Sequence, residues 1–377
     1  MDTPFIYGKV VQNETFTNRE SETNQLALNF SSGINTILIS PRRWGKSSLV
    51  MKASKITMEN NPEIRFCFID CYNVRQEDEF YHLLAQEVLK VASSKIEELM
   101  ATAKNFLGRF LPRLTFNPEP NSEISVELDY REVRKQPDDI LNLAEVLAIE
   151  KNLKIVVCID EFQNISGFDD PESFQKKLRS HWQKHTRVSY CLYGSKRHML
   201  MDVFSSPSMP FYKFGDIFFI QKIKPEDWIP FIISRFASTG KVINEQDAAL
   251  ITNLAECHSQ YVQQLAQQVW FRTEITANQN IIIEAHESLI LQLGLLFQSM
   301  AEGLSNTQIN FLKAVLSEAS LFSSKDTIQE YGLGTSANVL RIKQALVNKE
   351  IIDIQGDTIE LIDPMFKYWL KKHYFKI

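Results

Sequence analysis

Cysteine is scarce in this 377-residue chain. The five cysteines stand at positions 67, 71, 158, 191 and 257, and none forms a C-x-x-C pair. This spacing argues against zinc-ribbon and thioredoxin-like redox motifs. Because most of the cysteines lie inside apolar, strand-like segments, we expect buried free thiols.

Long apolar runs are also missing from the sequence. No run approaches the roughly 18–20 apolar residues that a helix needs to span a bilayer. The N-terminal segment MDTPFIYGKV has no basic region followed by an apolar one, so it does not resemble a secretory leader. We therefore expect a cytoplasmic protein that has no membrane partner.

A strong net charge of either sign is absent as well. The formal net charge is −5, which offers no global attraction to nucleic acid but does not exclude a local basic face. With 44% hydrophobic and 23% charged residues, 13 glycines and 13 prolines, the composition is far from disordered and fibrous classes. The length exceeds that of one ordinary domain, so we expect two or three.

Strand and helix patterns alternate along the first 224 residues. Short apolar runs rich in β-branched residues predict strands buried on both faces, at 34–40, 65–70, 154–159, 188–194 and 216–221. Helical periodicity separates them, at 45–57, 78–101 and 137–151. This alternation predicts an α/β core with a parallel sheet.

The remaining segments have a different character. Residues 106–136 contain three prolines and then the alternating stretch ISVELDY, which indicates an insertion with one exposed strand. Between residues 225 and 302 apolar residues recur at helical spacing, which predicts a helical domain. Residues 303–377 show three helices and a hairpin that turns at Gly356-Asp357, the order of a winged helix.

Residues 40–48, SPRRWGKSS, match the phosphate-binding loop G-x-x-x-x-G-K-S/T except that Ser40 stands at its first glycine. The following proline confines Ser40 to extended backbone, which serine adopts without strain. Backbone N–H groups, a helix N-terminus, a lysine and a Mg²⁺-binding hydroxyl are what a nucleotide phosphate requires. We expect the nucleotide to contact Pro41, Arg42, Arg43, Trp44, Gly45, Lys46, Ser47 and Ser48. The two arginines contact phosphate or a partner subunit, or are simply solvated.

A second motif is the strand KIVVCI, which ends in Asp160-Glu161. Two carboxylates at the end of an apolar strand repel each other, and Mg²⁺ with an attacking water would relieve that repulsion. We assign Asp160, with Ser47, to Mg²⁺ and Glu161 to activation of the water. The alternative is that the pair caps a helix beginning at FQNI. Ser195 would lie beside the γ-phosphate if its strand neighbours 154–159; otherwise it is a turn or cap residue.

Several segments together resemble the archaeal-type ATPases of the STAND branch of AAA+-like P-loop ATPases. These segments are FTNRE at 16–20, SPRRWGKSSLV at 40–50, VVCIDEFQNI at 156–165, LYGSKRHML at 192–200 and SSPSMPFYKFG at 205–215. The resemblance covers nearly the whole chain. It implies a sheet of strand order 5-1-4-3-2 with nucleotide at the carboxyl ends of the strands, then a helical lid and a winged helix.

The same resemblance implies roles for four further residues. Phe16 and Arg19 would lie near the adenine, Ser195 would sense the γ-phosphate, and His258 would approach the nucleotide from the lid. Taken alone, FTNRE predicts a helix start at Thr17 or Asn18, and His258 is a polar residue at a helix start. Relatives often have arginine in the segment that reads PFYKFG here, so we expect no arginine finger there.

We expect an ATPase that binds ATP or ADP with Mg²⁺ and acts as a slow, partner-dependent molecular switch, with a protein partner or as a homo-oligomer. The alternative is an ATP-regulated DNA-binding protein that reads DNA with the helix at 336–348. Residues 301–377 hold nine basic and nine acidic side chains, a weak electrostatic footprint for DNA. A third possibility is a nucleotide-binding scaffold that lacks a partner's arginine and never hydrolyses.

Overall fold

The computed structural model describes residues 3–9, 18–92, 113–115, 125–127, 137–195, 197–205, 207–319 and 321–377. The chain forms two compact units. The sheet unit is Arg19–Gln221, and the helical unit combines Met1–Asn18 with Lys222–Ile377. The division into three domains at residues 224 and 302 stays a prediction.

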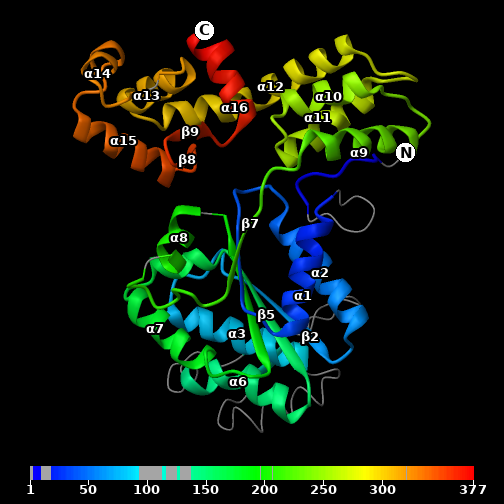
Figure 1. Ribbon diagram of the computed structural model, residues 1–377, viewed down its shortest axis with the longest axis vertical. Helices are drawn as coiled ribbons and strands as arrows, with labels where there is room; N and C mark the ends of the chain where they lie inside the picture. Colours follow the sequence, from blue (N-terminus) through cyan, green and yellow to red (C-terminus); the bar gives the residue numbers. More distant parts are fainter. Residues whose placement is uncertain are drawn as a thin grey trace. The chain divides into compact units, whose positions relative to one another are not determined.

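A five-stranded parallel sheet organises the sheet unit (Figure 1). Its strands are β1 (Thr36–Ile39), β2 (Ile64–Asp70), β5 (Lys154–Asp160), β6 (Val188–Gly194) and β7 (Asp216–Phe219). Their order is β2-β5-β6-β1-β7, which confirms the expected order 5-1-4-3-2 when the five strands are numbered along the chain. Every residue of β6 is buried, as expected for a strand covered on both faces.

Helices cover both faces of this sheet. On one face lie α1 (Glu20–Ser32) and α2 (Lys46–Asn60), and the rings of Phe30 and Phe66 meet there at 5.1 Å. The other face carries α3 (Glu77–Ala92), α6 (Pro137–Glu150), α7 (Pro171–Trp182) and α8 (Arg197–Ser205). A short 3-10 helix, Phe162–Gly167, follows β5.

The expected start of the first helix was wrong. The helix α1 begins at Glu20, and Arg19 precedes it with φ 69° and no side-chain capping bond. Asn18 has φ 46°, whereas an N-cap residue normally adopts the extended region, so Asn18 does not cap this helix. Thr17 lies outside the described residues. The sequence pattern misplaced the start because a capping residue type says nothing about its backbone conformation.

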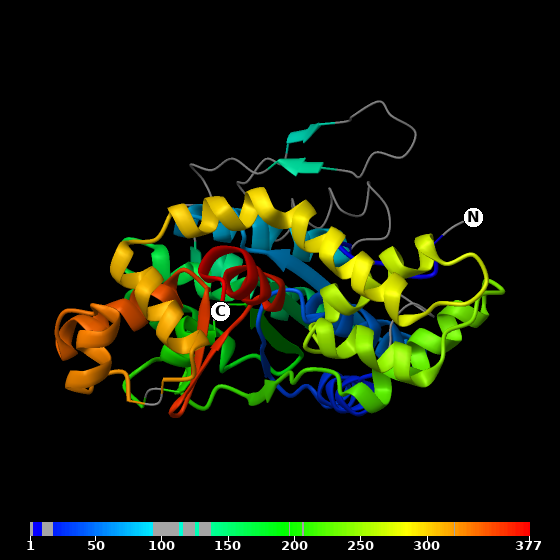
Figure 2. The ribbon, with the colours of Figure 1, turned by 90° about the horizontal axis from the view of Figure 1, so that it is seen from above.

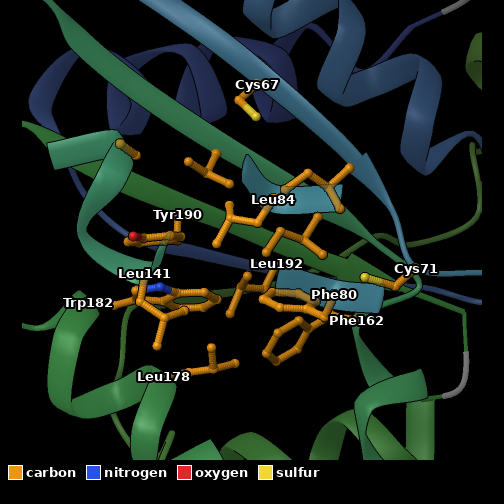
Figure 3. Close-up of a cluster of buried hydrophobic side chains, with 14 of the residues drawn as sticks. Cys67, Cys71, Phe80, Leu84, Leu141, Phe162, Leu178, Trp182, Tyr190 and Leu192 are labelled. Atoms are coloured by element: carbon orange, nitrogen blue, oxygen red, sulfur yellow. The ribbon is translucent and has the colours of Figure 1, made fainter. Parts of the chain in front are cut away.

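An aromatic cluster fills the core between the sheet and the helices α6 and α7 (Figure 3). The indole of Trp182 stacks on the ring of Tyr190, with centroids 4.0 Å apart and an interplanar angle of 14°. Phe162, from the turn after β5, lies 6.3 Å from the same indole. The core therefore packs directly beneath the turn that carries the acidic pair.

Replacing Trp182 by alanine is expected to destabilise the protein by about 3–5 kcal/mol, because the cavity left by a buried indole collapses only partly. The measurement is the shift of the urea unfolding midpoint. The matched control is Tyr72→Ala, since Tyr72 is 61% exposed in the same unit and its loss should cost less than about 0.5 kcal/mol. Equal effects of the two variants would contradict this packing.

The cysteines are free, as expected. Cys67, Cys71, Cys158 and Cys191 are buried, and Cys257 is half-buried. Burial raises the pKa of the Cys67 and Cys71 thiols, which keeps them protonated and unreactive. These four residues serve as small apolar side chains in the sheet unit.

Two strands of the insertion are described. The strands β3 (Arg113–Thr115) and β4 (Ser125–Glu127) pair antiparallel as a small hairpin (Figure 2). The sequence indicated one strand in this region, which corresponds to β4, and the structure adds β3. The rest of the 106–136 insertion lies outside the described residues.

The helical unit begins with four helices, as the apolar spacing predicted. They are α9 (Pro225–Ala237), α10 (Glu245–Leu254), α11 (Ser259–Arg272) and α12 (Gln279–Glu302). Asn244 and Asn278 cap α10 and α12 by accepting backbone N–H bonds. The N-terminal segment packs against this unit, since the buried ring of Phe5 lies 5.7 Å from that of Phe236.

The helix α12, drawn in yellow in Figure 2, is an exception to the expectation that no segment is long and apolar enough to span a bilayer. By length and composition alone it is apolar enough to cross a membrane, and 33% of its apolar window is buried. Core helices of globular proteins pass the same test, so this is weak evidence. The side chains that α12 buries in the helical unit are Ile282, Ala285, His286, Leu289, Ile290, Phe297 and Ala301.

The end of the chain forms the predicted winged helix. It comprises α13 (Asn306–Leu316), α14 (Lys325–Tyr331), α15 (Ser336–Asn348), β8 (Ile352–Gln355) and β9 (Thr358–Leu361). The wing strands pair antiparallel and turn at Gly356, which has φ 60°. A further helix, α16 (Pro364–Trp369), was not predicted from the sequence; Asp363 caps it by accepting bonds from Met365 and Phe366 N–H.

Candidate nucleotide-binding site

The loop between β1 and α2 has the backbone of a phosphate-binding loop. Gly45 precedes the helix with φ 90°, a conformation that glycine adopts without cost. Arg43 also has a positive φ, 66°, which is uncommon for a residue with a side chain and clusters at functional sites. Ser40 is buried and is not among the positive-φ residues, in agreement with the extended backbone expected before Pro41.

Lys46 is the first residue of α2, and only 6% of it is exposed. Its Nζ donates to the carbonyl oxygens of Ser40, at 3.2 Å, and Pro41, at 3.3 Å. The loop therefore closes around its own lysine and holds a buried positive charge beside the N-terminus of a helix. That combination favours an anion.

Ser47 and Asp160 meet where α2 begins and β5 ends. The hydroxyl of Ser47 donates to Asp160 Oδ2 at 2.8 Å, and Oδ1 accepts the N–H of Glu161 at 2.8 Å. Burial raises the pKa of the Asp160 carboxyl, although these two hydrogen bonds lower it in part. A cation would favour the ionised carboxylate, and Mg²⁺ prefers such oxygen ligands. The residues present therefore fit Mg²⁺.

The described residues contain no cluster of three or more His, Cys, Asp or Glu side chains that could enclose a metal ion. Mg²⁺ is usually held by one or two protein oxygens together with phosphate and water. Ser47 and Asp160 supply such a minimal set.

Glu161 lies next to Ser195 at the carboxyl edge of the sheet. The strands β5 and β6 are neighbouring and parallel, as the predicted place of Ser195 beside the γ-phosphate requires. The Ser195 hydroxyl donates to Glu161 Oε2 at 3.1 Å and accepts a bond from Arg42 Nε at 3.3 Å. A chain of hydrogen bonds thus joins the phosphate-binding loop to the ends of two strands.

The capping alternative for the acidic pair receives little support from this geometry. Glu161 occupies the position before the 3-10 helix with φ 51°, but its side chain makes no capping bond. The Asp160 carboxylate is engaged by Ser47 and by the Glu161 N–H. A strained backbone at the end of a strand favours a functional role.

Gln163, two residues after Glu161, belongs to this site but was not predicted from the sequence. Its side chain is fully buried, and its Nε2 donates to Glu161 Oε2. The available signal was a polar residue among the apolar side chains of the turn, in the segment EFQNI. Burial of an amide requires a hydrogen-bond partner, and that partner is the proposed base itself.

Arg19 reaches the phosphate-binding loop from the start of α1. It is only 3% exposed, and its guanidinium donates to the carbonyl oxygens of Trp44, at 3.2 Å, and Gln221, at 2.9 Å. Glu22 pairs with it at 3.1 Å. The structure therefore brings Arg19 to the loop backbone. Its expected place near adenine stays a prediction, and Phe16 lies outside the described residues.

The other expected contacts of the loop lie at its surface or on α2. Arg42 and Arg43 are exposed, Pro41 and Trp44 are half-buried, and Ser48 is buried. The exposed Arg42 is nevertheless bonded to Ser195, so it is more than a solvated residue. Nothing in the described geometry gives Arg43 such a contact.

His258 belongs to the helical unit. It stands immediately before α11, is 3% exposed and lies 4.9 Å from the ring of Tyr261. It occupies a helix start, as the sequence taken alone predicted, and its side chain makes no capping bond. Its approach to nucleotide stays a prediction.

Comparisons with known proteins support this description of the fold. A family model described as a probable winged helix domain matches residues 295–372. A search of curated protein sequences finds no match. A solved structure of a Walker-type ATPase of Pyrococcus abyssi is similar, with a TM-score of 0.66 and 16% identity, over 98% of this chain and 100% of that one.

A second solved structure is the ORC2 protein of Aeropyrum pernix in its ADPNP–ADP complexes. Its TM-score is 0.55 at 15% identity, over 96% of this chain and 94% of that one. At such low identity the likeness establishes the fold alone. The resemblance seen in the sequence motifs is thus confirmed at the level of the fold: the chain has a P-loop ATPase fold followed by helices and a C-terminal winged helix, and this fold is similar to that of the Walker-type ATPase of Pyrococcus abyssi and of the ORC2 protein of Aeropyrum pernix.

Proposed function

We propose that this protein binds ATP with Mg²⁺ and hydrolyses it. The observation that carries the proposal is the meeting of Lys46, the Ser47–Asp160 pair and the Ser195–Glu161 pair at one edge of the sheet. The paired oxygens lie 2.8 Å and 3.1 Å apart. A lysine in a phosphate-binding loop, a hydroxyl, a Mg²⁺-binding carboxylate and a base are the parts that phosphoryl transfer to water requires.

Each residue has a defined task in this proposal. The loop N–H groups, the N-terminus of α2 and Lys46 hold the phosphates. Ser47 and Asp160 would hold Mg²⁺, which supplies positive charge against the charge developing on the phosphoryl oxygens. Glu161 orients a water and takes its proton, and Ser195 contacts the γ-phosphate.

The network also supports a switch. Arg42 donates to Ser195, which in turn donates to Glu161, and an arriving γ-phosphate would compete for both donors. A ligand that changes such contacts shifts the balance between two arrangements of the protein. We therefore infer an ATP-dependent switch of the STAND type, with slow turnover that a protein partner or a second copy accelerates. Adenine is proposed because ORC2 forms ADPNP and ADP complexes.

Removal of Mg²⁺ is the first test of this proposal. We expect the purified protein to bind ATP and to hydrolyse it slowly, and we expect excess EDTA to stop phosphate release. The measurement is phosphate release at saturating ATP, beside a titration with fluorescent ATP. Absence of ATP binding would overturn the proposal, whereas binding without turnover would favour a non-hydrolysing scaffold.

The winged helix offers little that favours the alternative function in DNA binding. Its candidate recognition helix, α15, exposes Arg341 but also Leu340, which is 66% exposed. Lys343 lies over the ring of Phe322, 5.3 Å from its centroid. One exposed cation and an apolar side chain are a poor match for a phosphate backbone.

We therefore expect no submicromolar binding to duplex DNA, with or without ATP. The measurement is fluorescence anisotropy of a labelled duplex at about 50 and 200 mM salt, where phosphate contacts produce a steep loss of affinity. Arg341→Ala serves as the control for any signal. Binding that weakens steeply with salt and is lost in that variant would favour the DNA-binding function instead.

A further inference from the structure

Gln163 occupies a place that no part of the proposed mechanism uses. It lies in the 3-10 helix after β5, and its side chain is fully buried. Its Nε2 donates to Glu161 Oε2, the same atom that accepts the Ser195 hydroxyl. Two donors from different strand ends therefore fix one oxygen of this carboxylate. Among the described residues, no hydrogen bond reaches the other oxygen, Oε1.

The orientation of the Gln163 amide follows from the chemistry of its partner. An ionised carboxylate only accepts hydrogen bonds, so the NH₂ group must face Glu161 and Oε1 must point away. That Oε1 is buried and has no hydrogen-bond partner among the described residues. A buried amide oxygen without a partner is costly, so the position of this side chain calls for an explanation.

Gly194 explains how the amide is held. A Cβ atom built on Gly194 would lie 1.8 Å from Gln163 Oε1 and 2.9 Å from its Cδ. Only a residue without a side chain leaves room for the amide at the end of β6. The Gln163 side chain is thus wedged between the last residue of β6 and the carboxylate that follows β5, which limits its freedom to turn.

We propose that Gln163 is a positioning residue for ATP hydrolysis. Held against Gly194, its amide fixes Oε2 of Glu161 and leaves Oε1 as the atom that takes the proton from the attacking water. The inference rests on the proposed ATPase function and adds a residue to which that proposal gave no task. Gly194 matters in the same way, because it makes the space that the amide occupies.

The test replaces the amide without emptying its site. We expect Gln163→Leu and Gln163→Met to lower kcat for ATP about 10- to 100-fold, because misplacing a reacting group by about 1 Å costs that much. KM and the dissociation constant for ATP should stay within about twofold of the wild type, since Gln163 is not among the groups proposed to hold the phosphates. Gly194→Ala should give the same pattern by displacing the amide.

Two controls separate positioning from a general structural effect. Gln175 in α7 is a second buried glutamine whose Oε1 lacks a partner, so Gln175→Leu matches the loss of a buried amide away from Glu161. It should leave kcat unchanged. In a Glu161→Gln background, Gln163→Leu should cause no further loss, because residues that act through one another are not additive.

The outcomes distinguish this inference from the function on which it rests. A wild-type protein that does not hydrolyse ATP overturns both. Normal turnover by the wild type with an unchanged kcat in Gln163→Leu and Gln163→Met overturns the role of Gln163 and leaves the ATPase standing. A raised KM at constant kcat, or an additive loss with Glu161→Gln, also overturns it. ATP binding by each variant shows that the sheet unit is folded.

Discussion

Replacing Lys46 by alanine is expected to abolish ATP binding. The change removes the buried ammonium that lies 3.2 Å from the Ser40 carbonyl and 3.3 Å from that of Pro41. Without it, the loop N–H groups alone face the phosphate charge. We expect the affinity to fall by at least about 100-fold, or about 2.8 kcal/mol. Titration with fluorescent ATP in Mg²⁺ measures this loss.

The matched control for that experiment lies on the same helix. Lys55 is an exposed lysine of α2, so Lys55→Ala removes the same charge from the same helix at a distance from its N-terminus. It should leave the affinity for ATP within about twofold, since exposed charges contribute little. Normal ATP binding by Lys46→Ala would show that the loop was misinterpreted.

Replacing Glu161 by glutamine is expected to stop turnover while ATP remains bound. Glutamine keeps the shape of the side chain but cannot take a proton from water. Loss of a general base costs about 100- to 10,000-fold in rate. The measurement pairs single-turnover phosphate release with the same fluorescence titration, so that binding and chemistry are read separately.

A second carboxylate of the sheet unit provides the control for Glu161. Glu172 pairs with Lys176 at 2.6 Å on α7, and both side chains are more than half exposed. Glu172→Gln should change neither turnover nor ATP binding, because exposed ion pairs contribute little. Full activity in Glu161→Gln would assign water activation to another group and leave the acidic pair a structural role.

Features carried by neighbouring residues could be predicted from the sequence. The strands of the sheet were recognised because apolar, β-branched runs are a local signal, and the helical and winged-helix segments followed from 3.6-residue spacing. The loop at 40–48 was recognised for the same reason, since all of its functional groups lie within nine residues. Asp160 and Glu161 stood out because acids directly follow a buried strand.

Features that join distant parts of the chain needed the tertiary structure. Ser195 could be placed beside Glu161 only once β6 was seen to neighbour β5. The bonds of Arg19 to Trp44 and Gln221 span 25 and 202 residues, and no local pattern encodes such a separation.

Gln163 shows most clearly where sequence interpretation ends. Its spacing from Glu161 is visible in the sequence, but its proposed role depends on the hydrogen bond from its amide to Glu161 and on the bare backbone of Gly194. Both properties belong to the folded chain. The sequence by itself indicated most of the elements and the residues proposed to carry the chemistry, because those signals are local. Only the tertiary structure decided which groups hold one another in place, because that depends on which strand ends pack together.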